Sequence, residues 1–100
     1  MSKYQKIKLA LLGAGFDNLC QAGSVSRFHK MNIVADSAAL GLRFWFCVCG
    51  GYRVPDELYM TTRRLGVAGS DERTYFKSQQ EMVDQIETIR QTITQRRRDE

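Results

Sequence analysis

The sequence predicts an α+β fold in which an N-terminal helix, a small antiparallel sheet and a long C-terminal helix follow one another. Three observations lead to this fold class. Apolar residues recur at helical spacing near both ends of the chain, and the densest aromatic and branched run, residues 42–49, lies between glycines. The 100 residues, 43% of them apolar, supply one modest core. We therefore expect a single domain over residues 1–100, with a basic tail at residues 95–100.

The first expected helix covers residues 2–21. Its apolar stripe has spacings of three and four residues and consists of Tyr4, Ile7, Leu9, Leu11, Leu12, Phe16 and Leu19. Gly23 follows as a suitable C-cap. Gly13 and Gly15 each weaken a helix by about 1 kcal/mol relative to alanine. These two glycines therefore either break the helix or let a neighbouring element approach it closely.

The expected sheet is centred on residues 42–49, the segment LRFWFCVC. Residues 27–35 before it mix apolar and polar side chains and predict a half-buried strand. Gly50 and Gly51 after it suit a tight hairpin turn, because glycine readily adopts positive φ. Pro55 is then expected to stop the returning strand or to restrict it to a sheet edge.

Two further segments precede the C-terminal helix. Residues 58–65 fit either a short strand or a helical turn, and the pattern does not decide between the two. Residues 66–70 predict a loop. The number of strands in the expected sheet therefore stays open.

The C-terminal helix has the clearest signals in the chain. Ser78 and Glu81 fit a capping box, in which the serine oxygen accepts a helical amide and the glutamate reaches back. The apolar stripe that follows repeats at steps of four, three and four residues, through Met82, Ile86, Ile89 and Ile93. Three consecutive arginines then lie at the C-terminal end of the helix, where the helix dipole favours cations.

A regular strand over residues 42–49 divides its side chains between two faces. One face carries Leu42, Phe44, Phe46 and Val48 and is expected to belong to the core, while the other carries Arg43, Trp45, Cys47 and Cys49. Two interpretations of the second face remain open. The N-terminal helix covers Trp45, or Trp45 and Arg43 form an exposed anchor of the kind that dominates protein interfaces.

No set of residues fills the roles that catalysis needs, so we expect no enzymatic activity. Cys20, His29, Cys47 and Cys49 are the residues that could hold zinc. Alternate residues on a strand lie about 6.5–7 Å apart, however, which disfavours binding of one tetrahedral ion by both strand cysteines. A glycine pair near the N-terminus matches only part of a dinucleotide fingerprint. We therefore expect neither a metal nor a cofactor.

Charge and hydropathy limit the classes of partner. The formal net charge of +4 permits a nucleic acid or an acidic protein as partner and requires neither. No uncharged run is longer than residues 44–52, which is far shorter than the roughly 20 apolar residues that cross a bilayer, so no membrane partner is expected. Three cysteines without disulfide spacing favour a reducing cytoplasm.

Aromatic residues and arginines are the candidate binding residues, because these types contribute most of the affinity at protein interfaces. The candidates for protein binding are Trp45, Tyr52, Arg53, Pro55, Tyr59, Arg63 and Arg64. The alternative is direct binding of DNA or RNA phosphates through Arg96, Arg97 and Arg98.

Two segments carry a family resemblance. Residues 1–8, MSKYQKIK, and residues 53–57, RVPDE, resemble the anti-RecBCD proteins that lambdoid phages express against a host enzyme. The resemblance implies a protein of the host cytoplasm that binds the RecC subunit of the RecBCD exonuclease–helicase. It further implies inhibition or modulation of that enzyme, so that phage DNA ends survive and recombine, without catalytic residues in the phage protein. Pro55, the one proline of the chain, would then be the position for a host prolyl isomerase.

Overall fold

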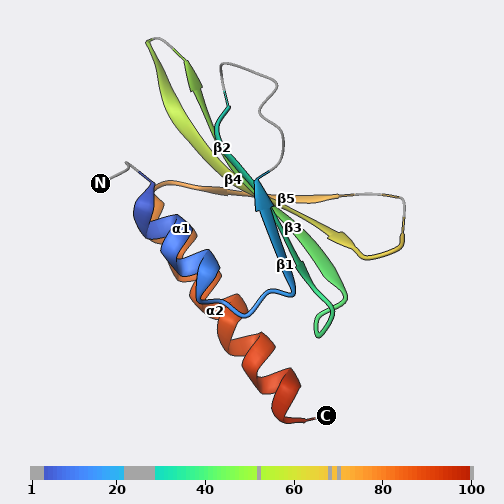
Figure 1. Cartoon of the computed structure of the whole chain (residues 1–100). Coiled ribbons are helices and arrows are strands. Elements are labelled where there is room, and N and C mark those ends of the chain that lie inside the picture. Colours follow the sequence, from blue (N-terminus) through green and yellow to red (C-terminus); the bar gives the residue numbers. More distant parts are fainter. Residues whose placement is uncertain (1–3, 22–28, 52, 68, 70, 100) are drawn as a thin grey trace.

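The computed structural model describes residues 4–21, 29–51, 53–67, 69 and 71–99. The elements in chain order are α1 (Gln5–Leu12), β1 (Asn18–Gln21), β2 (His29–Ser37), β3 (Leu42–Gly51), β4 (Val54–Arg64), β5 (Glu72–Phe76) and α2 (Gln79–Arg98). The strands form one antiparallel sheet in the order β1-β2-β3-β4-β5, so each strand pairs with its neighbours in sequence. Figure 1 shows both helices on the same side of this twisted sheet. The α+β prediction is therefore confirmed.

The N-terminal helix is shorter than the sequence predicts. It ends at Leu12, and Gly15 adopts a left-handed backbone with φ of 88°. The prediction of a helix over residues 2–21 is wrong beyond this point, because residues 18–21 instead pair with β2 as an edge strand. Gly23, the expected C-cap, lies outside the described residues. The glycines thus break the helix, which was the first of the two roles considered for them.

The strands on either side of the expected hairpin extend further than predicted. The strand expected at residues 27–35 is described from His29 and continues to Ser37. The strand expected at residues 42–49 continues through Gly50 and Gly51, which are not the turn. Gly51 pairs with Val54, so the pairing of β3 with β4 continues past both glycines. Arg53, directly before Val54, adopts a positive φ of 68°.

Gly50 is required by a close approach rather than by a turn. A Cβ atom at this position would lie 2.5 Å from the Asp56 carboxylate. Pro55 is the second residue of β4, so the expectation that it stops the returning strand is wrong. The strand β5 pairs with β4 only from Leu58 to Thr62, so within the described residues β4 has only β3 as a strand neighbour at Pro55. The register is irregular there, since Cys49 pairs with Glu57 while Gly51 pairs with Val54. Such a bulge accommodates proline, because a bulged residue needs no ladder hydrogen bond.

Residues 58–64 belong to β4, which resolves the choice between strand and helical turn. The expected loop at residues 66–70 follows, although residues 68 and 70 lie outside the described part. The strand β5 was not predicted. Its sequence, ERTYF, contains too few buried apolar residues to give an alternating signal.

The core lies between the two helices and one face of the sheet (Figure 1). The predicted stripe of α2 is buried, and so are the predicted core residues Phe44, Phe46 and Val48 of β3. The predicted cap is present as well, because the Glu81 amide donates to Ser78 Oγ at 3.2 Å. The Glu81 carboxylate accepts from the Lys77 amide, which fixes the entry of the chain into α2.

A hydrogen bond between side chains connects the start of the helical layer to the sheet. At the start of α1, the Tyr4 hydroxyl donates to Asp56 at 2.6 Å, and Lys30 Nζ donates to the other oxygen of the same carboxylate at 2.6 Å. Burial and the Asp56 carboxylate raise the pKa of Tyr4 to about 12. Neither described helix is long and apolar enough to cross a membrane.

Candidate functional site

The helices cover one face of the sheet, and we call the opposite face of β2–β5 the open face (Figure 1). The strand registers and their alternation define its members. These are Asn32, Val34, Asp36, Arg43, Trp45, Cys47, Cys49, Glu57, Tyr59, Thr61, Arg63, Arg73 and Tyr75. Because α1 packs on the other side, the interpretation in which it covers Trp45 is wrong.

Trp45 lies at the middle of the open face, between two arginines. The Arg43 guanidinium carbon is 5.9 Å from the centre of the Trp45 ring, and that of Arg63 is 5.3 Å away. These distances allow a cation–π interaction on a partly buried indole. The indole is therefore held in place by its neighbours on β3 and β4 and not by a helix.

Each of these two arginines is also held by a carboxylate. Arg43 donates to both oxygens of Asp36, at 2.7 and 3.0 Å, and Arg63 donates to both oxygens of Asp71, at 2.6 and 2.9 Å. These hydrogen bonds keep the pKa of both aspartates below the ordinary range. Two-point contacts of this kind fix the orientation of a guanidinium as well as its charge. Each arginine beside Trp45 is therefore fixed in orientation, and one carboxylate balances its charge.

The third arginine organises the tyrosines of the open face. The Arg73 guanidinium lies 4.5 Å from the centre of the Tyr59 ring and donates to the Tyr75 hydroxyl at 3.4 Å. The two tyrosine rings are 5.7 Å apart and tilted by 49°. Tyr75 is 56% exposed, so this cluster presents a large aromatic surface to solvent.

The Cys47 thiol of the open face is not arranged as a nucleophile. Burial raises the pKa of the Cys47 thiol, which donates to Asn32 Oδ1 at 3.3 Å. Cys49 Sγ lies 3.5 Å from the Tyr59 hydroxyl, and this contact raises the pKa of Tyr59. A thiol with a raised pKa is mostly protonated near neutral pH and reacts slowly. Within the described part of the chain, no three His, Cys, Asp or Glu residues are grouped to hold a metal ion.

A shallow depression of about 290 Å³ lies at the centre of the open face. It is lined by Asn32, Trp45, Cys47, Tyr59, Thr61, Arg63, Asp71 and Arg73. Its surroundings are balanced in charge, since the three arginines of the open face are accompanied by Asp36, Glu57 and the adjacent Asp71. The open face, counted together with Asp71, thus has as many carboxylates as arginines, although the whole chain carries +4.

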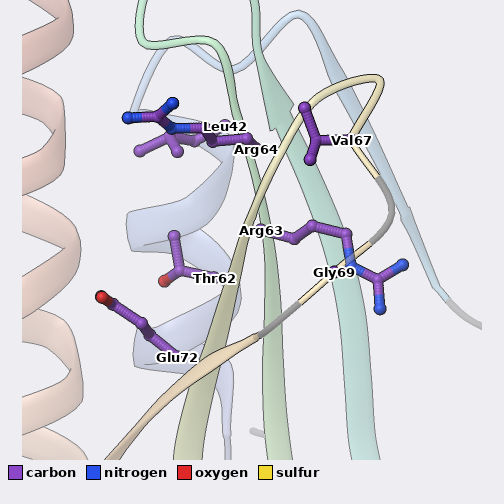
Figure 2. Close-up of a pocket in the computed structure, with 7 residues that line it drawn as sticks. All are labelled: Leu42, Thr62, Arg63, Arg64, Val67, Gly69 and Glu72. Carbon is purple, nitrogen blue, oxygen red and sulfur yellow. The ribbon is translucent and has the colours of Figure 1, made fainter.

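Three of the seven residues predicted to bind a protein come together on the open face, namely Trp45, Tyr59 and Arg63. Arg64 does not lie on the open face. Figure 2 shows it on the helix side of the sheet, pointing away from Arg63, above a groove of about 490 Å³. The groove is lined by Leu42, Thr62, Arg63, Arg64, Val67, Gly69 and Glu72.

The other predicted residues lie elsewhere. Arg53 and Pro55 are exposed near the connection between β3 and β4, at the opposite end of β4 from Arg63. Tyr52 lies outside the described residues. The predicted protein-binding set is therefore divided between the open face and the hairpin.

The arginines predicted to bind nucleic acid lie at the end of α2, away from the open face (Figure 1). Arg97 donates to the Gly15 carbonyl at 2.8 Å and lies 3.6 Å from the Asp17 carboxylate. Arg97 therefore ties α2 to the segment after α1. Arg96 and Arg98 are exposed in the last helical turn.

Sequence reasoning named Arg43 with Trp45, because the two residues share a strand face. It missed Tyr75 as a site residue and did not place Arg73 beside the tyrosines, since β5 itself gave no signal.

Comparison with known proteins adds no assignment: no family model, curated protein or solved structure matches this chain. The function must therefore be argued from the geometry of the open face.

Proposed function

We propose that this protein is a non-catalytic binding module that docks onto a protein partner through the open face. One observation carries the proposal. Three aromatic rings, those of Trp45, Tyr59 and Tyr75, are interleaved with arginines on the face of the sheet opposite α1 and α2. Tryptophan, tyrosine and arginine are the residue types enriched among those that dominate protein interfaces.

The charge balance favours a protein partner over a nucleic acid. Phosphate binding draws its affinity from cations that replace condensed counterions. Arg43 and Arg63 are instead engaged by Asp36 and Asp71, and their guanidiniums lie beside the Trp45 ring. A base stacking on that ring would compete with both arginines. A protein surface with apolar and polar patches matches such a face better.

The partner we propose is a host DNA-processing enzyme, and RecC within RecBCD is the one implied by the resemblance of residues 1–8 and 53–57. Docking would inhibit or redirect the enzyme by occupying its surface, so that phage DNA ends survive. The exposure of Pro55 is consistent with an additional contact to a host prolyl isomerase.

Affinity measurements with purified RecBCD test this proposal. The chain and two variants, Trp45→Ala and Arg64→Ala, are compared by biolayer interferometry, with circular dichroism to verify folding. Trp45→Ala should weaken binding by about 2 kcal/mol or more, roughly thirtyfold, because it removes a central anchor. Arg64→Ala is the matched control, since Arg64 points to the helix side (Figure 2), and should bind like the parent chain.

Two results would contradict the proposal. Absence of binding to RecBCD removes that partner, and equal affinity of the parent chain and Trp45→Ala removes the open face as the docking surface. A single-stranded oligonucleotide distinguishes the alternative. Affinity that falls steeply with salt and is lost on replacing Arg96 and Arg98 would instead support direct binding of nucleic acid.

A further inference from the structure

The strand β5 forms one edge of the described sheet, with β4 as its only strand neighbour. Its pairing with β4 is regular from Leu58–Phe76 to Thr62–Glu72, without a bulge. The strand is short and carries Glu72 and Arg73, but its five residues include no proline, so every one of them keeps its backbone N–H. This edge therefore remains competent to pair with another strand.

One hydrogen bond identifies which backbone groups of β5 point outward. The Leu65 amide donates to the Gly41 carbonyl at 3.0 Å, in the continuous register of β3 and β4. Hydrogen-bonded and non-hydrogen-bonded pairs alternate along an antiparallel ladder. Alternate residues of β4, namely Leu58, Met60 and Thr62, therefore direct their backbone groups toward β5. On β5, Arg73 and Tyr75 are left with N–H and C=O groups that point away from the sheet.

A groove of about 280 Å³ lies beside this edge, between β5 and α2. It is lined by Tyr75, Phe76, Glu81, Asp84, Gln85 and Thr88. Phe76 is partly buried and gives the groove an apolar wall, while two carboxylates give it negative charge. Gln80 donates to Asp84 at 2.9 Å, but this neutral amide leaves the carboxylate charge unbalanced. The groove is thus acidic in a chain that is basic as a whole.

We propose that the β5 edge and this groove take up an extended segment of the protein partner that carries Lys or Arg next to an apolar side chain. The segment would add a sixth strand, with backbone hydrogen bonds to Arg73 and Tyr75 and its basic side chain facing Glu81 and Asp84. Strand addition is an established mode of peptide recognition, in which backbone bonds give affinity and side-chain pockets give specificity. The inference rests on the proposed function and names the kind of segment the partner offers.

Charge disfavours a second copy of this chain in the three registers whose axis lies at a central residue of β5. Pairing across a two-fold axis places residues of the same face opposite each other. An axis at Arg73 brings the two Arg73 side chains together, and an axis at Tyr75 places Arg73 opposite Lys77 of the second copy. Like charges directly opposite each other destabilise a strand pair.

The third of these registers has its axis at Thr74. It places Glu72 of the second copy opposite Phe76, beside the groove that already contains Glu81 and Asp84. A third carboxylate at this point is unfavourable, whereas a Lys or Arg is favourable. The acidic groove therefore selects a foreign, basic segment.

A displayed library of random ten-residue peptides is the probe for this inference, selected against the full chain. Enriched peptides should carry Lys or Arg beside an apolar residue, and Asp84→Lys should abolish their binding. The matched pair is Tyr75→Pro and Tyr75→Ala. Both remove the tyrosine side chain, but only proline removes the outward N–H, and neither disturbs a β4 hydrogen bond. Tyr75→Pro should bind a selected peptide about tenfold more weakly than Tyr75→Ala.

Three results would overturn the inference. They are enrichment of acidic peptides or of none, equal peptide affinity of Tyr75→Pro and Tyr75→Ala, and a dimer in sedimentation experiments that Tyr75→Pro dissociates. Trp45→Ala separates this inference from the proposed function. Peptide binding that survives this variant while RecBCD binding is lost locates strand addition at the edge and docking at the open face. If neither Trp45→Ala nor Tyr75→Pro weakens binding to RecBCD, the proposed function fails, whatever the result of the peptide measurements.

Discussion

Trp45 lies beside two guanidinium groups, and each of those groups is held by a carboxylate. This arrangement orders an aromatic anchor without burying it under a helix, and an anchor that is ordered before binding loses less conformational entropy on docking. The pattern of β3 predicted the partnership of Arg43 and Trp45. It could not predict that Arg63 and Asp71 lie beside this pair, because their position depends on the pairing of β3 with β4.

Gly50 is a second residue whose role depends on one contact. Replacement by alanine places a methyl group 2.5 Å from the Asp56 carboxylate, which is already bound to Tyr4 and Lys30. We expect Gly50→Ala to lower the free energy of unfolding by about 1–3 kcal/mol. Gly69→Ala is the control, because no atom lies within 4 Å of its added Cβ. Urea denaturation measures both, and equal stability of the two variants would contradict the close approach.

Tyr4 gives a prediction for alkaline pH. Its pKa is raised to about 12 in the folded chain, from an ordinary value of 10.0. Between these values the unfolded chain loses the proton and the folded chain keeps it. The resulting stabilisation is therefore complete below about pH 10 and is lost as pH rises through about 12. The urea midpoint should fall between about pH 9 and about pH 11, and it should fall more for the parent chain than for Tyr4→Phe. An equal fall in both chains would refute the raised pKa of Tyr4.

At the scale of elements, the strength of the local signal decided what the sequence could predict. The helix α2 was predicted from Ser78 to its arginines, because capping and a four-three-four stripe agree. The strand β1 was taken as helix, since its few residues continue the apolar spacing of α1 and only Gly15 marks the break. The strand β5 depends on pairing with β4 for its existence, and such long-range pairing leaves no local pattern.

The cap of α2 supports a prediction of its own. Ser78→Ala removes the oxygen that accepts the Glu81 amide, so the free energy of unfolding should fall by about 1 kcal/mol. Gln91→Ala, on the exposed side of the same helix, should change it by less than about 0.5 kcal/mol. Thermal denaturation followed at a helical wavelength compares the two. A Ser78→Ala variant as stable as Gln91→Ala would show that the cap does not stabilise α2.

At the scale of the whole molecule, the chain concentrates its packing on one side of the sheet. The buried stripes of α1 and α2 meet the core face of β2–β4, and Arg97 ties the end of α2 to the Gly15 carbonyl. On the opposite face, neither α1 nor α2 covers the aromatic residues, so these residues can contact solvent or a partner. The sequence predicted two helices, a sheet and a central aromatic strand. It could not predict that both helices lie on the same side, which is what creates the open face.

Hydroxyl-radical footprinting of the chain in complex with RecBCD tests the central claim most directly. Oxidation of Trp45, Tyr59 and Tyr75 is measured by mass spectrometry with and without the partner, and the exposed Leu9 and Leu12 of α1 serve as internal references. Docking through the open face predicts that the three aromatic residues are protected while both leucines are oxidised as before. Protection of Leu9 and Leu12 with unchanged oxidation of the three aromatic residues would contradict the account.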